Sequence, residues 1–113
     1  MSYAAGRLRH RVTIQQPVQA QDPVTGELVQ TWTDFAADIA AAIEPLSTRE
    51  FAAAQQIQSE IVARIVIRYR TGITAEMRVI HNGTVYNIAG VLADKDSGRE
   101  YLTLPVSTGV NQG

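Results

Sequence analysis

Residues 60–70 have the sequence EIVARIVIRYR, and this stretch decides the fold class. Its side chains alternate with a period of two, which is the pattern of a β-strand with two different faces. One face carries Ile61, Ala63, Ile65, Ile67 and Tyr69. The other face carries Val62, Arg64, Val66, Arg68 and Arg70. The stretch therefore predicts a strand that places one side in the core.

The N-terminal third predicts further strands. Residues 7–17 alternate in the same way, and residues 27–35 are rich in residue types that suit a pleated surface. Turn formers lie between them, so we expect these two strands to form a hairpin with an extended loop over 17–27. Residues 38–44 predict a third strand, because Pro45 ends any helix that the alanines before it favour.

One short helix is expected within 47–59. Ser47 and Glu50 have the spacing of a capping box, in which each side chain binds the backbone amide of the other residue. The alanine and glutamine residues that follow have good helix propensity. The apolar stripe of this helix is thin, so we expect the helix to lean on the sheet without deep burial.

The C-terminal part predicts more hairpin structure. Asn82-Gly83 lies between the strand candidates 77–81 and 84–88, and this dipeptide is the strongest short signal for a two-residue hairpin. A polar turn over 94–98 precedes a last strand over 100–106. The prediction is a mainly β fold with a minor α part. It is a small antiparallel β-barrel of six to seven strands, with one short helix between the third and fourth strands.

Length and composition bound the possible functions. The chain has 113 residues, a formal net charge of −1 and no cysteine. This is enough for one domain, which we place at 7–106 with flexible termini over 1–6 and 107–113. The charge balance argues against a dedicated nucleic-acid binder, and the absence of cysteine excludes disulfides. No apolar run is long enough for a membrane helix, so no membrane partner is expected.

The sequence offers no constellation for catalysis. Its two histidines, His10 and His81, lie on separate predicted strands and belong to no metal-binding or nucleophile motif. Asp94 and Asp96 lie in the polar turn, where solvation is the ordinary state of a carboxylate. We therefore predict that the protein is not an enzyme and needs no metal or other cofactor.

Two rows of arginine side chains are candidate binding features. Arg7, Arg9 and Arg11 point the same way on the first strand, and a second row consists of Arg64, Arg68 and Arg70. Solvent, a protein partner and nucleic acid all remain possible for these rows. Alternation places Tyr69 opposite the second row, which weakens a nucleic-acid platform of interleaved aromatic and basic residues. Trp32 is interpreted as a core residue or an interface anchor.

Several segments, taken in order, resemble a family of phage proteins. They are Leu8–Gln15 (LRHRVTIQ), 22–27 (DPVTGE), 31–34 (TWTD), 42–50 (AIEPLSTRE), 67–70 (IRYR), 72–73 (GI), 77–79 (MRV) and 86–88 (YNI). Together they resemble the head–tail joining family of tailed bacteriophages, also called head completion or stopper proteins. The resemblance covers residues 7–104 and implies a small β-barrel with one helix.

The resemblance also implies a function. Such a protein forms a ring in the virion, in the head–tail connector beneath the portal and its adaptor. There it closes the exit channel of the packaged double-stranded DNA and docks the tail. We expect the protein to be made in the cytoplasm of the bacterial host. The isolated protein should self-associate only weakly, and it should form a six-fold ring in the particle. Two alternatives stay open: a tail-completion or tail-terminator protein, and a small nucleic-acid-binding β-barrel.

Two sets of residues are predicted to serve this role. Cyclic rings need two different complementary patches on each subunit. We expect the row Arg7, Arg9 and Arg11 to face acidic residues of the next subunit, with Asp34, Asp38 and Glu44 as candidates. The segment 36–59 is expected to face the channel, with the loop 17–27 as the alternative. The candidate channel residues are Ala41, Ser47, Arg49 and Ala54.

Overall fold

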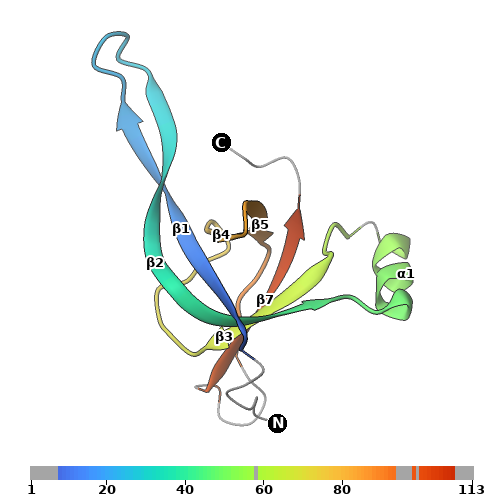
Figure 1. Ribbon diagram of the computed structural model, residues 1–113. Helices are drawn as coiled ribbons and strands as arrows, with labels where there is room; N and C mark the ends of the chain where they lie inside the picture. Colours follow the sequence, from blue (N-terminus) through green and yellow to red (C-terminus); the bar gives the residue numbers. More distant parts are fainter. Residues whose placement is uncertain (1–7, 58, 94–97, 99, 109–113) are drawn as a thin grey trace.

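The computed structural model describes residues 8–57, 59–93, 98 and 100–108, and it contains seven strands and one helix in that part of the chain (Figure 1). The elements are β1 (His10–Gln21), β2 (Leu28–Pro45), α1 (Thr48–Gln56), β3 (Ala63–Arg68), β4 (Arg78–His81), β5 (Thr84–Ile88), β6 (Leu92–Ala93) and β7 (Tyr101–Thr108). The predicted polar turn over 94–98 lies, except for Gly98, outside the described residues.

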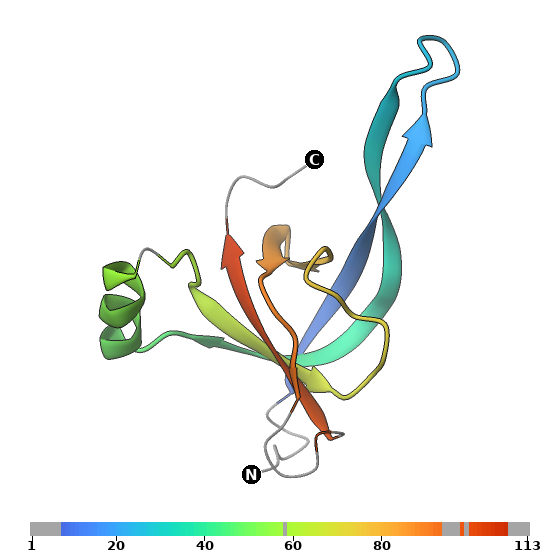
Figure 2. The ribbon, with the colours of Figure 1, turned by 180° about the vertical axis from the view of Figure 1, so that it is seen from behind.

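The strands form one antiparallel sheet that closes on itself. Its order is β3-β2-β1-β4-β5-β7-β6, and a further pairing of β3 with β7 completes the ring. The view from behind shows the same strands surrounding the centre of the molecule (Figure 2). Closure leaves few unpaired strand edges in the body of the protein. The predicted mainly β antiparallel fold with one short helix is confirmed.

The prediction of separate strands over 27–35 and 38–44 is wrong, because both belong to the continuous strand β2. Twice along its pairing with β1, β2 contains one extra residue. The first lies between the pairs Val12–Ile39 and Ile14–Ala36, and the second lies between the pairs Ile14–Ala36 and Gln15–Asp34. Asp38 has a φ of 57°, in the left-handed region. These bulges bend β2 without ending it. The helix therefore follows the second strand of the chain, not the third.

The core lies inside the closed sheet. The inward residues of β3, Ile65 and Ile67, are fully buried and pack with Leu104 and Val106 of β7. A second, smaller cluster covers the outer side of β3, so that both faces of this strand are buried at its centre. Its buried members are Leu8, Ala42, Val66 and Tyr101. The period of two in the sequence predicted the first cluster but not the second.

The hairpin β1–β2 extends beyond the body as a long two-stranded arm (Figure 1). Residues 17–27 were predicted to be a loop, which is wrong: β1 continues to Gln21, and the loop is only 22–27. The arm comprises residues 16–33, from the pair Gln16–Thr33 to the pair Gln21–Leu28 and its turn. In contrast, the predicted Asn82-Gly83 hairpin is present, with both residues at positive φ.

The end of the sheet also differs from expectation. The last strand was predicted to end at residue 106, but β7 continues through Ser107 and Thr108, which pair with Asn87 and Tyr86 of β5. The predicted flexible residues 1–6 lie outside the described part of the chain. Among the described residues, no helix has the length and apolar character needed to cross a membrane.

Candidate interaction surfaces

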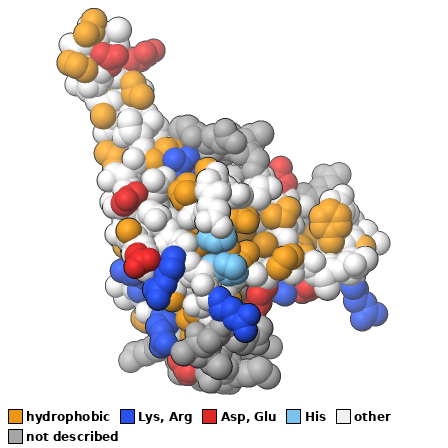
Figure 3. Space-filling model, in the orientation of Figure 1, with side chains coloured by type: hydrophobic (Ala, Val, Ile, Leu, Met, Phe, Trp, Pro, Cys, Tyr) orange, Lys and Arg blue, Asp and Glu red, His pale blue; other side chains and the backbone are white. Residues whose placement is uncertain are grey.

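The arm exposes apolar side chains that have no core to pack against. Val24 at the turn is 90% exposed and Leu28 is 68% exposed, while Val18 and Val29 are also exposed. Asp22 and Glu27 flank the turn, and residues 12–48 of the sequence contain no lysine or arginine. Figure 3 shows hydrophobic and acidic side chains together at the tip of the arm. The tip is therefore both apolar and acidic.

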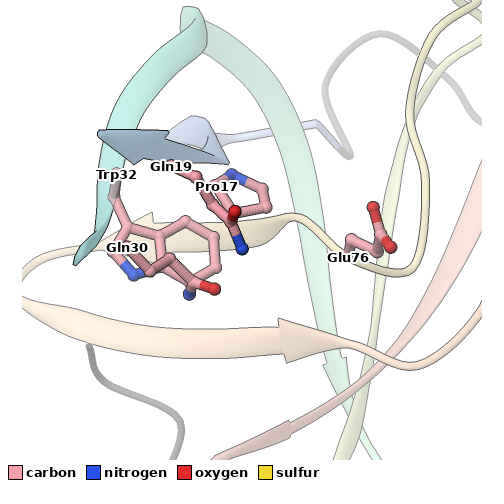
Figure 4. A pocket seen from close by; sticks show the side chains of 5 residues that line it. All are labelled: Pro17, Gln19, Gln30, Trp32 and Glu76. Atoms are coloured by element: carbon pink, nitrogen blue, oxygen red, sulfur yellow. The ribbon is translucent and has the colours of Figure 1, made fainter. Parts of the chain in front are cut away.

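A hollow of about 410 Å³ lies along one side of the arm. The cross-strand pairs Pro17–Trp32 and Gln19–Gln30 share one face of the arm, and these four side chains form one wall. Glu76 lies across the hollow from them (Figure 4). Trp32 is half-buried here and is not a member of the core clusters. Its indole Nε1 is shielded from solvent and has no hydrogen-bond partner among the described residues.

Arg78 fixes the base of the arm to the body. Its guanidinium lies 4.2 Å from the centre of the Trp32 ring, within the range of a cation–π interaction. Its Nε donates to Gln15 Oε1 at 2.9 Å, and Gln15 Nε2 donates to Asp34 Oδ1 at 3.1 Å. Burial lowers the pKa of the Arg78 guanidinium. Sequence analysis did not identify Arg78, because the pairing of β1 with β4 that brings it to Trp32 is long-range.

Two members of the predicted basic row, Arg9 and Arg11, lie beside two of their predicted acidic partners within the same subunit. Arg9 and Glu44 line the same shallow hollow of about 200 Å³, together with His10. Arg11 Nη1 donates to the backbone carbonyl of Asp38 at 3.5 Å. Arg7 lies outside the described residues. These contacts within the subunit occupy part of the surface that was predicted to join two subunits.

The two histidines are neighbours in space. The rings of His10 and His81 have centroids 4.9 Å apart and meet edge to face. Figure 3 shows lysine or arginine side chains beside both rings. In the described part of the chain, no group of three or more potential ligand side chains is placed to hold a metal ion. The sequence did not predict this proximity, because it depends on the pairing of β1 with β4.

Helix α1 projects from the opposite side of the body to the arm (Figure 1) and has no buried residue. The predicted capping box is confirmed: Glu50 N donates to Ser47 Oγ at 3.2 Å, and Ser47 N donates to Glu50 Oε1 at 3.0 Å. Arg64 on β3 donates to both oxygens of the Glu50 carboxylate. Hydrogen bonds from Arg64 and Ser47 lower the pKa of Glu50 to about 2.

The predicted channel-facing residues divide into two groups. Ser47 and Arg49 are exposed on α1, and Ala54 is half-buried there. Ala41 is fully buried in the core, where it pairs with both His10 and Ile67. Ala41 therefore lines no surface of this subunit, and residues 36–45 are paired strand.

A third hollow, of about 270 Å³, lies where β2 passes the end of β3. It is lined by Asp38, Ile39, Ala40, Arg68, Tyr69 and Arg70. The guanidinium of Arg70 lies 6.0 Å from the centre of the Phe35 ring. Alternation predicted Tyr69 on the opposite face from the arginines, but β3 ends at Arg68, and Tyr69 lines this hollow together with Arg68 and Arg70.

Comparisons with known proteins agree with the architecture. The sequence model of the family described as phage head completion protein matches residues 3–109. The solution structure of protein SF1141 from Shigella flexneri 2a has a TM-score of 0.72 and 34% identity, covering 95% of this chain and 97% of that chain. A chain in the virion of a native gene transfer agent particle has a TM-score of 0.57 and 14% identity, covering 92% and 96%. No curated protein matches the chain.

Proposed function

The chain belongs to the phage head completion protein family and is a structural protein of a phage particle, and from this premise we propose that it forms a ring in the head–tail connector. In that ring it closes the exit channel of the packaged double-stranded DNA and docks the tail. Its partners are further copies of itself, the portal or adaptor ring on the head side and the tail proteins. The role is structural, without a catalytic step.

The observation that carries this proposal is the extent of the family match. It spans residues 3–109 and so includes the whole closed sheet, the arm and α1. The shape of the subunit supports it, because the arm and α1 project from a closed body in different directions (Figure 2). A subunit of a ring needs two different surfaces of this kind, one for each neighbour.

The contact between subunits in the proposed ring involves the basic row Arg7, Arg9 and Arg11. Glu44 and Asp38 already lie beside Arg9 and Arg11 within the subunit, as described above. Asp34 accepts a hydrogen bond from Gln15 at the base of the arm. Asp34, Asp38 and Glu44 can therefore bind a neighbouring subunit only if they share or exchange their present contacts within their own subunit.

The channel-facing element in this proposal is α1. Ser47, Arg49 and Ala54 remain its candidate residues, whereas Ala41 is withdrawn because it is buried. The helix has no buried residue, and Arg64 of the body binds its Glu50, so the helix can move when its neighbours change. The arm is the alternative element. The chain has no cysteine, so single cysteines at 47, 49 or 24 give unambiguous cross-links in DNA-filled heads.

The test is a phage that lacks the gene for this protein. We expect normal tails and heads that package DNA but lose it and fail to join tails. Purified protein added to these heads should restore joining. Heads that retain DNA while the tails have abnormal length would contradict the connector role and favour the tail-terminator alternative. Normal particles without the protein would contradict both.

A nucleic-acid-binding role is the second candidate, and one observation favours it. Tyr69 lies with Arg68 and Arg70 around one hollow, and this combination of aromatic and basic side chains suits a nucleic acid strand. Asp38 in the same lining and the net charge of −1 oppose it. If the protein retards duplex or single-stranded DNA in a gel mobility-shift assay, and Arg70→Glu abolishes this retardation, the result would support this candidate.

A further inference from the structure

The third hollow has the chemistry to receive an apolar group with negative charges beside it. Ile39, Ala40 and Tyr69 give it an apolar lining. Two arginines, the exposed Arg68 and the half-buried Arg70, contribute positive charge at the same place. The carboxylate of Asp38 is the one acidic group among the described residues that line it.

The tip of the arm has the complementary chemistry, and its turn is preorganised. Val24 and Leu28 are the two most exposed large hydrophobic side chains of the arm, and Asp22 and Glu27 lie beside them in the sequence. The Asp22 carboxylate accepts hydrogen bonds from the amides of Val24 and Thr25, at 2.8 Å and 3.4 Å. The turn is closed by a hydrogen bond from Asp22 N to Glu27 O at 2.8 Å. Little conformational freedom is lost when such a turn docks.

The tip cannot fill the hollow of its own subunit. Leu28 and Ile39 lie eleven residues apart on the same strand, β2, which at ~3.3 Å per residue would span about 36 Å if straight and spans less because the bulges bend it. Figure 1 shows the tip at the far end of the arm from the body that carries β3. An occupant with the chemistry of the tip must therefore come from another molecule.

We propose that the tip of the arm, residues 22–28, docks into the hollow between β2 and β3 of a second copy of this chain. Val24 and Leu28 enter between Ile39, Ala40 and Tyr69, and Glu27 meets Arg70. The contact is head-to-tail, with the tip on one partner and the hollow on the other, so a pair of copies keeps one free tip and one free hollow. Contacts of this type close into rings, and in that respect the inference rests on the proposed function.

Burial explains why the arm would need such a neighbour. A two-stranded ribbon is marginally stable alone in water, and within the described part of the chain no third strand pairs with the arm along residues 16–33. Docking covers the exposed apolar side chains at its tip and brings opposite charges together. Nucleic acid fits the hollow less well, since its lining includes Ile39, Ala40 and the carboxylate of Asp38.

Disulfide cross-linking tests the contact directly. Two single variants, Val24→Cys and Tyr69→Cys, are mixed at high concentration under mild oxidation, one of them with a tag that changes its mass. We expect the mixed dimer to form several-fold more than either homodimer, because a disulfide needs Cα atoms within about 7 Å. The matched control replaces Tyr69→Cys with Thr84→Cys, at a site that is exposed on β5 and belongs to none of the proposed contacts. Equal yields in both mixtures, or mainly Val24–Val24 dimers, would overturn the proposal.

Charge reversal gives a second, independent readout. Glu27→Arg and Arg70→Glu should each weaken self-association, measured by sedimentation, by about threefold to tenfold, and the double variant should restore it. Glu60→Arg changes the net charge by the same amount as Glu27→Arg, at an exposed site outside the proposed contact, and should leave self-association unchanged. If neither single variant weakens association, or if duplex DNA binds the hollow through Arg70 and blocks the cross-link, the contact is wrong.

The docking contact and the connector role can fail independently of each other. If the phage without the gene has open heads but Val24→Asp protein completes them normally, the connector role stands and the docking contact fails. If that phage makes normal particles while the mixed disulfide still forms, the contact stands and the connector role fails.

Discussion

Arg64 on β3 holds Glu50 on α1 through two hydrogen bonds, from Nη1 to Oε2 at 2.6 Å and from Nη2 to Oε1 at 3.4 Å. The same Glu50 closes the capping box at the start of the helix. One carboxylate therefore both begins the helix and attaches it to the sheet. Since α1 has no buried residue, this pair determines how firmly the helix is positioned.

Acid should loosen α1 before it unfolds the body. The pKa of Glu50 is lowered to about 2 in the folded protein, from an ordinary value of 4.5. A lowered pKa stabilises the fold above pH 4.5, and this contribution is lost as the pH falls toward 2. The protection factors for amide exchange of residues 48–56, which correct for the intrinsic pH dependence of exchange, should therefore fall over that range by more than those in β3. Glu50→Gln should remove the pH dependence, and an unchanged profile in that variant would contradict this account.

Replacing Ser47 by alanine should weaken α1 alone. The substitution removes the hydroxyl that accepts from Glu50 N, and the usual cost of losing such a cap is ~1 kcal/mol. We expect lower helix content with an unchanged sheet, measured by backbone chemical shifts. Thr48→Ala, one residue further, is the matched control, and an equal loss of helix in both variants would argue against the capping box.

Two glycines at positive φ should respond differently to alanine. Gly72 has a φ of +92°, and an added Cβ would lie 2.9 Å from Cζ of Phe35. Gly83 has a φ of +81°, with nothing within 4 Å of the added Cβ. Gly83→Ala should cost ~1 kcal/mol of unfolding free energy from backbone strain, and Gly72→Ala should cost more, about 2 kcal/mol or above. Denaturant unfolding measures both, and equal costs would show that Phe35 yields freely.

Side chains of the body and of the arm should differ in their effect on stability. Ile65→Ala leaves a cavity in the core and should cost ~2–5 kcal/mol. Leu28→Ala, at a site 68% exposed on the arm, should change the unfolding free energy by less than ~0.5 kcal/mol. The measurement is equilibrium unfolding of the isolated protein. A large cost for Leu28→Ala would mean that the arm packs on its own subunit.

Local patterns in the sequence predicted the local parts of the fold. The period of two around Ile65, the Asn82-Gly83 turn and the Ser47–Glu50 box each depend on residues within a few positions of one another. The union of two predicted strands in β2 did not follow, because alanines and Asp38 between them resemble a break. Only pairing with β1 and β3 keeps that chain extended.

The candidate surfaces were less accessible from the sequence for the same reason. The arginine row near Arg9 could be read from alternation, but its proximity to Glu44 depends on the pairing of β1 with β2. Part of the arm, residues 17–27, was interpreted as a loop because the turn formers Pro23 and Gly26 lie within a short stretch. Its exposed valines gave no signal, since valine in a strand usually predicts burial.

A reconstruction of the intact particle that contains this protein tests the central claim most directly. The account predicts a ring of copies of this chain between the head and the tail, with α1 or the arm directed toward the channel axis. The same map would show whether residues 22–28 of one copy lie against Tyr69 of the next. A particle in which the chain lies elsewhere, or is absent from the head–tail junction, would contradict the account.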